Sequence, residues 1–198
     1  MTPTYLPLSA DALVPNSGEV AARLKIPRSR VDRALTDGEL AELRRVSSPA
    51  CTFVRVNVLR GGDGCIDLGF GAVASRSLNA ALDSCNEALV FALTLGAGVD
   101  RYLMRLSRTS PARCFIADGL ASALCEAACD AAEKIMTGNS EHRPRFSPGY
   151  GDLPLEIQPR VLAVTDARRR LGISLNDALL MSPSKSVTAI VGLVSRKS

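Results

Sequence analysis

The sequence predicts an α+β fold, in which the helices of a single domain pack on a central, mostly antiparallel sheet. Three stretches carry this prediction. Residues 51–59 alternate between two faces, as in a half-buried strand. Residues 88–95 form a continuous apolar run, which is typical of a central strand covered on both faces. Residues 112–136 have the dense small residues of a long, closely packed helix.

The N-terminal part predicts an arm followed by helices. Residues 1–16 are rich in proline and are expected to form an N-terminal arm, which leaves residues 17–198 as the domain. Ser17 is expected to cap a short helix that ends near Leu24. Residues 20–31 have the rhythm of a helix-turn-helix. Two interpretations of this segment therefore remain: a nucleic-acid-binding motif, or an ordinary helical hairpin that covers the sheet.

The middle of the chain predicts a hairpin and a strand-turn-helix unit. The glycines and Asp63 of G-G-D-G, residues 61–64, favour a tight turn between strand 51–59 and a second strand over 65–70. The turn G-A-G-V-D, residues 96–100, joins the apolar strand to a helix that is expected to end near Leu106. Because Arg101 takes the place of a third glycine, this turn does not complete a dinucleotide-binding motif.

The C-terminal part predicts one helix and a final strand. A loop over residues 138–153 is long for a compact domain, which favours a functional or a disordered segment. One amphipathic helix is expected from Pro154 to Leu171, and Gly172 ends it. The apolar run 186–194 is expected to be the last strand.

Composition excludes several classes of site. The chain has 198 residues, a net charge of +4, six cysteines and one histidine. The cysteines form no C-x-x-C pair, so we expect no metal site. A single loop histidine gives no visible nucleophile–base pair, and no catalytic residue is assigned. The scattered basic residues do not favour nucleic acid as a partner. Free thiols and the lack of an export signal or a membrane span predict a cytoplasmic protein with no membrane partner.

Candidate binding residues gather in R-F-S-P-G-Y-G-D-L-P, residues 145–154, and on the helix before it. Arg145 can bind a carboxylate through two hydrogen bonds, and Tyr150 offers a ring and a hydroxyl group. Glu126 and Asp130 lie one helical turn apart and share a face. This set suits a small zwitterionic ligand with an adenosine. The alternative is a plain connector beside a solvated acidic stripe, in which Lys134 pairs with Asp130.

The same loop resembles a known family. The pattern R-x-x-x-G-Y, with Arg145, Pro148, Gly149 and Tyr150, is similar to a motif in the activation domain of cobalamin-dependent methionine synthase. Further stretches are similar to the small, stand-alone activation-domain-like proteins and occur in the same order. They are T-L-G-A-G-V-D at 94–100, A-L-C-E-A-A-C-D at 123–130, G-Y-G-D-L-P-L-E-I-Q at 149–158 and M-S-P-S-K-S-V at 181–187.

The resemblance implies a function in methionine biosynthesis. S-adenosylmethionine would bind to this chain, and the cobalamin would be carried by a partner, a methionine synthase or another corrinoid protein. A flavodoxin-type protein would supply an electron, and the methyl group would then restore methylcobalamin from cob(II)alamin. Arg145 would contact the carboxylate or backbone of the methionine part, and Gly149 and Tyr150 would shape the pocket wall. Glu126 would face the ligand, with Asp130 beside it.

The sequence departs from the family in two places. Gly151 and Asp152 follow the motif, where the family usually has Pro-Ala. The last strand has Ile190 and Val191 where the family carries an aromatic pair. The second departure keeps an alternative open, in which the chain is a non-catalytic partner of a corrinoid methyltransferase and has lost ligand binding.

Overall fold

The computed structural model describes residues 1–25 and 33–194. Its centre is a four-stranded antiparallel sheet in the order β1 (Thr4–Pro7), β2 (Ala50–Asn57), β6 (Cys85–Thr94) and β9 (Ser186–Val194). The apolar strand β6 lies between β2 and β9, as expected for a strand that is buried on both faces. The predicted α+β fold with an antiparallel sheet and packed helices is therefore confirmed.

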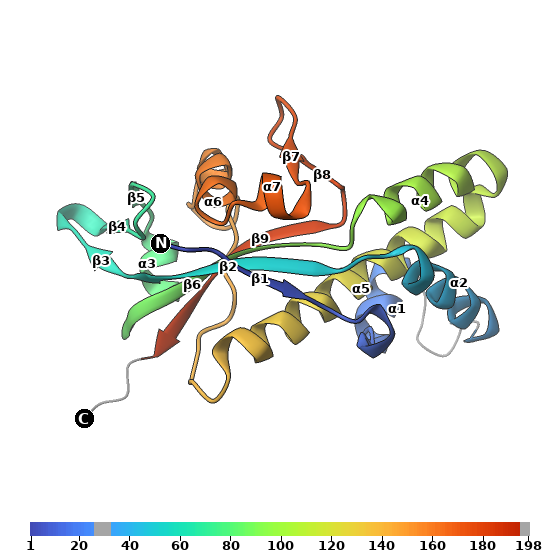
Figure 1. Ribbon diagram of the computed structural model, residues 1–198, viewed down its shortest axis with the longest axis horizontal. Coiled ribbons are helices and arrows are strands. Elements are labelled where there is room, and N and C mark those ends of the chain that lie inside the picture. Colours follow the sequence, from blue (N-terminus) through green and yellow to red (C-terminus); the bar gives the residue numbers. More distant parts are fainter. Residues whose placement is uncertain (26–32, 195–198) are drawn as a thin grey trace.

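One face of the sheet is covered by four helices, α1 (Ser17–Leu24), α2 (Arg33–Val46), α4 (Ala97–Thr109) and α5 (Pro111–Thr137) (Figure 1). Leu89, Phe91 and Leu93 of β6 point into this core, since alternate residues of a strand face the same side. The small residues of α5 allow close packing: a Cβ placed on Gly119 would lie 2.8 Å from the side chain of Leu24.

The other face carries α3 (Arg76–Ala81), the 3-10 turn η4 (Leu155–Ile157), α6 (Gln158–Val164) and α7 (Ala167–Leu171). Ala88 and Val90 of β6 and Ile190 of β9 are fully buried on this side. The sheet is thus the middle of three layers. The strand β9 lies at the edge of this sheet, where helices of both outer layers can contact it.

Short elements complete the fold. Two 3-10 turns are η1 (Ala10–Ala12) and η3 (Gly62–Gly64). A small sheet of β3 (Leu59–Arg60), β4 (Cys65–Asp67) and β5 (Ala72–Ala74) lies beside α3 (Figure 1). A hairpin of β7 (Ser174–Leu175) and β8 (Met181–Ser182) leads to β9.

The structure corrects several predicted boundaries. The side chain of Asn16, not Ser17, caps α1 by accepting a hydrogen bond from the N–H of Gly18. The sequence favours a helix over residues 37–46 with Thr36 as its cap, but helix α2 begins at Arg33, so Thr36 lies inside it. The expected continuous helix to Leu171 is broken between α6 and α7, because Asp166 has a left-handed backbone with φ 53°.

The proposed helix-turn-helix lies only partly in the described residues. Its first helix, α1, uses Val20 and Leu24 to pack on α5. The turn and the two arginines, Arg28 and Arg30, fall within residues 26–32, outside the described residues. Across 1–25 and 33–194, no helix is both long enough and apolar enough to span a bilayer.

Candidate functional site

The loop that follows α5 is fixed to the edge of β9. The N–H of Phe146 donates to the carbonyl of Ile190, and the N–H of Ile190 donates to the carbonyl of Phe146, each at 2.8 Å. The N–H of Arg143 donates to the carbonyl of Gly192 at 2.9 Å. Thr188 lies two residues before Ile190, so its N–H and C=O point toward the same outer edge. Here the loop turns away from β9 and a cavity opens.

A second attachment holds the far end of the loop on α3. The Asp152 carboxylate accepts hydrogen bonds from the Ser75 hydroxyl at 2.6 Å and from the N–H groups of Arg76 at 2.8 Å and Ser77 at 3.0 Å. The Ser75 hydroxyl bond is the main reason that the Asp152 pKa is lowered, and the two backbone N–H groups add to it. A Cβ on Gly151, which has φ 57°, would collide with the Ser77 hydroxyl. Gly151 and Asp152, which depart from the family pattern, therefore anchor this loop.

Arg145 connects the loop to α5 through three carboxylates. Its Nη2 lies 2.7 Å from Glu126, and its Nη1 lies 2.7 Å from Asp130 and 2.6 Å from Glu133. The Arg145 side chain is 24% exposed and that of Glu133 is 10% exposed, so this pair is shielded from water. Arg23 of α1 adds a further cation 3.2 Å from Glu126. The four residues Glu126, Asp130, Glu133 and Arg145 are called the Arg145 cluster below.

Electrostatics in the Arg145 cluster keep the arginine charged. Burial alone would lower the pKa of the Arg145 guanidinium, but the hydrogen bonds to Asp130, Glu133 and Glu126 raise it above the ordinary value. Three hydrogen bonds use three of the five N–H groups of a guanidinium. Arg145 is thus a rigid link between loop and helix that still retains donors.

A cavity of about 350 Å³ lies between this loop, α5, α6 and the first residues of β9. This volume falls in the range of small-molecule sites. Its lining residues come from five parts of the fold: Glu126, Arg145, Phe146, Ser147, Pro148, Tyr150, Gln158, Met181, Ser186, Val187 and Thr188.

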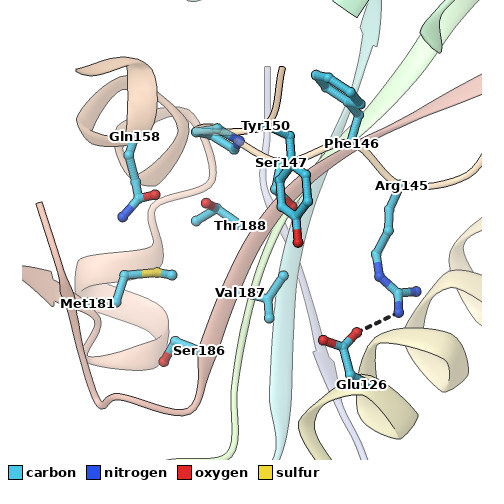
Figure 2. A pocket seen from close by; sticks show the side chains of 11 residues that line it. Glu126, Arg145, Phe146, Ser147, Tyr150, Gln158, Met181, Ser186, Val187 and Thr188 are labelled. Carbon is cyan, nitrogen blue, oxygen red and sulfur yellow. Dashed lines mark hydrogen bonds and ion pairs between the residues drawn. The ribbon is translucent and has the colours of Figure 1, made fainter. Parts of the chain in front are cut away.

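The two ends of the cavity differ in charge. Figure 2 shows Arg145 and Glu126 on one side and Gln158 and Met181 on the other, with Tyr150 between them. Tyr150 is 67% exposed and lines the cavity. Its ring centre is 6.4 Å from that of Phe146, at a tilt of 55°. The arrangement suits a ligand with a charged end, a neutral end and a flat surface for stacking.

The turn before β9 is also fixed to the helices beside the cavity. Lys185 donates to Ser122 at 2.9 Å and lies 2.7 Å from Asp118, both on α5. The Ser184 N–H lies 3.1 Å from the Asp100 carboxylate on α4. These contacts position Ser186 and Thr188 at the cavity floor.

The structure brings most of the predicted site residues together. Arg145, Pro148, Tyr150 and Glu126 line the cavity. Gly149 forms the turn of the loop, with φ 89°, and its N–H bonds to the carbonyl of Leu153. The carboxylate of Asp130 pairs with Arg145, and the residue lines a neighbouring depression instead. Their roles toward a ligand remain predictions.

Two residues of the site, Glu133 and Gln158, were not predicted from the sequence. Glu133 follows Glu126 by seven residues and Asp130 by three, a spacing that places all three on one helix face. That spacing could have identified Glu133 as a neighbour of the two predicted carboxylates. Gln158 gave no such signal, because its place in the cavity depends on how α6 packs against β9.

Known proteins match this chain in structure but not in sequence. No family model matches it, and no curated protein matches it. The crystal structure of the MetH reactivation domain bound to AdoHcy superposes with a TM-score of 0.77 and 14% sequence identity. The match covers 100% of this chain and 80% of that one.

The chain has the fold of the MetH reactivation domain. That reactivation domain was crystallised with AdoHcy. At 14% identity the likeness establishes the fold alone. Any inference about function therefore depends on the cavity and the Arg145 cluster.

Proposed function

We propose that this chain binds S-adenosylmethionine in the cavity beside β9 and reactivates a cobalamin-dependent methionine synthase whose cobalamin is held on a partner chain. The observation that carries this proposal is the cavity itself. The R-F-S-P-G-Y loop frames it in a reactivation-domain fold, and it has a charged end, a neutral end and an exposed tyrosine ring.

The residues present fit the ligand. Glu126 offers a carboxylate to the ammonium or sulfonium group, and the remaining N–H groups of Arg145 can donate to the ligand carboxylate. The Tyr150 ring provides a face for the adenosine. Asp130 and Glu133 hold the guanidinium and do not need to touch the ligand. The chain thus binds and orients a methyl donor without a proton-transfer residue.

The partner's cobalamin would supply the methyl-accepting centre. One electron from a flavodoxin-type donor and one methyl group from S-adenosylmethionine account for the change from cob(II)alamin to methylcobalamin, with AdoHcy as the second product. This chain's own part is to present the methyl group at the cavity opening, beside Tyr150, where a second protein can approach.

A reactivation assay tests this proposal. A methionine synthase that lacks its own reactivation domain is poised as cob(II)alamin, mixed with a reductant and S-adenosylmethionine, and followed by its absorption spectrum. We expect methylcobalamin to form only when this chain is added. Arg55→Ala, which changes an exposed pair with Glu87, should support the same rate as the unchanged chain.

A second candidate is a partner protein of a corrinoid methyltransferase that no longer binds the ligand. Two observations favour it. Ile190 and Val191 are fully buried in opposite cores, so neither presents a side chain to the cavity. The guanidinium of Arg145 is already held by three carboxylates. This candidate predicts that the chain co-purifies with a corrinoid protein but does not change the cob(II)alamin spectrum in the assay.

A further inference from the structure

The neutral end of the cavity contains an amide that the proposed function does not use. Gln158 is the first residue of α6 and is 4% exposed, yet it lines the cavity. Its Nε2 donates to the carbonyl of Leu179 at 2.8 Å. That bond fixes the orientation of the amide, because a carbonyl oxygen accepts only from the nitrogen side.

The oxygen of the same amide is left for a ligand. Within residues 1–25 and 33–194, Oε1 of Gln158 has no hydrogen-bond partner. Figure 2 shows this oxygen on the side of the amide that faces Thr188 and the cavity. Once a ligand fills the cavity, an acceptor that it covers without a donor is costly, and a ligand N–H at this point would satisfy it.

The surroundings of Gln158 define the chemistry of that N–H group. Met181 lies beside it, and the charged residues Arg145 and Glu126 are at the opposite end (Figure 2). The thioether of Met181 and the amide of Gln158 suit a part of the ligand that is neutral, flat and polarisable. An ammonium or carboxylate group of the ligand suits the Arg145 cluster. Of the parts of an adenosylated amino acid, only the adenine base is neutral and flat and carries an exocyclic amine.

We propose that Gln158 determines base specificity, with its Oε1 accepting a hydrogen bond from the exocyclic amine of adenine. This proposal rests on the proposed function, since it assigns one end of the same cavity. It places the amino-acid part of the ligand toward Glu126 and Arg145. A base with a carbonyl at the same position would set two acceptors against each other.

The test compares two ligands by titration calorimetry, S-adenosyl-L-homocysteine and S-inosyl-L-homocysteine, in which the exocyclic amine is replaced by a carbonyl and the adjacent ring nitrogen N1 gains a proton. We expect the unchanged protein to bind the adenine compound at least about tenfold more tightly. Gln158→Met keeps the length of the side chain and removes the amide. It should weaken binding of the adenine compound by about tenfold and abolish the preference between the two.

A control variant separates selectivity from local folding. Gln158→Met also removes the bond to Leu179, which can loosen the turn of residues 176–180. Asn176→Ala loosens the same turn, because its Oδ1 accepts from the N–H groups of Ala178 and Leu180, but Asn176 does not line the cavity. We expect Asn176→Ala to keep the preference for adenine.

The outcomes are distinct. Equal binding of the two ligands by the unchanged protein, or a preference that survives in Gln158→Met, would overturn the role of Gln158 and leave the proposed function standing. Loss of the preference for adenine in Asn176→Ala would also overturn the role of Gln158, because selectivity would then depend on the structure of the turn and not on the Gln158 amide. Failure of both ligands to bind at millimolar concentration would overturn the proposed function together with this inference.

Discussion

Glu133 accepts a 2.6 Å hydrogen bond from Nη1 of Arg145 and is the most buried carboxylate of the Arg145 cluster. The pair joins the loop that frames the cavity to helix α5, whose small residues pack against the sheet. Arg145 therefore has a structural role that its place in a ligand-binding motif does not reveal. Substitutions at Arg145 must be tested for stability before they are tested for binding.

Removal of Arg145 should destabilise the fold. Arg145→Met leaves three neighbouring carboxylates without their shared cation, and we expect a loss of about 2 kcal/mol in the free energy of unfolding, measured with urea. Arg55→Ala breaks a pair in which the arginine is 57% exposed, and it should cost less than about 1 kcal/mol.

The double variant Arg145→Met with Glu133→Gln should recover part of that loss, because it removes the most buried unpaired charge. A loss at Arg145 no larger than that at Arg55, or no recovery in the double variant, would show that the Arg145 cluster does not stabilise the loop.

Asp152 should make stability depend on pH. Its pKa is lowered in the folded protein, chiefly by the Ser75 hydroxyl, so the unfolded chain binds more protons in the acid range. The contribution of the ionised Asp152 carboxylate to stability is therefore complete above the ordinary aspartate pKa of about 4, and it is lost as the pH falls below that value.

Asp152→Asn should be less stable than the unchanged protein at pH 7, and the difference should shrink below about pH 4. Thermal unfolding from about pH 7 to about pH 2.5 measures this, with the exposed Asp177→Asn as control. A constant difference across that range would refute the role of the Asp152 carboxylate.

Gly98 should tolerate no side chain. A Cβ at this position would overlap the backbone carbonyl of Val46, where α2 ends against α4. Gly98→Ala should cost about 3 kcal/mol.

Gly38 of α2 is a matched control, because a Cβ added there would meet no heavy atom within 4 Å. Gly38→Ala should therefore stabilise the helix by up to about 1 kcal/mol. Urea unfolding of both variants checks the contrast, and a mild effect at Gly98 would mean that α2 and α4 can separate.

The six cysteines should differ in reactivity. Burial, with a further contribution from Glu133, raises the pKa of the Cys51 thiol to about 12, so little thiolate forms at about pH 8. Cys51, Cys85, Cys125 and Cys129 are buried, whereas Cys65 and Cys114 are partly exposed.

A thiol reagent at about pH 8 should label Cys65 and Cys114 first, and peptide mass spectrometry identifies the sites. Rapid labelling of Cys51 in the folded protein would contradict its burial.

The contrast between predicted and missed features has a physical cause. Strand β9 and helix α5 were predicted within a residue of their bounds, because periodicity and length are local signals. The break at Asp166 was missed, since a left-handed aspartate within an amphipathic pattern is set by how α6 and α7 pack.

The candidate site also contains residues that local sequence signals predict and residues that only tertiary packing brings together. Arg145 and Tyr150 could be found because a motif contains them. The anchoring of Asp152 to Ser75 joins residues 77 positions apart, and the position of Gln158 in the cavity depends on how α6 packs against β9 in the folded chain. Such contacts leave no pattern in one sequence.

Calorimetric titration with S-adenosylmethionine tests the central claim most directly, using the unchanged protein, Tyr150→Ala and Tyr5→Ala. Both tyrosines are exposed, but Tyr150 lines the cavity and Tyr5 lies on β1. We predict one binding site per chain, affinity reduced by about fivefold to tenfold in Tyr150→Ala, and no change in Tyr5→Ala. Absence of binding at millimolar ligand, or equal effects of the two substitutions, would contradict a binding site beside β9.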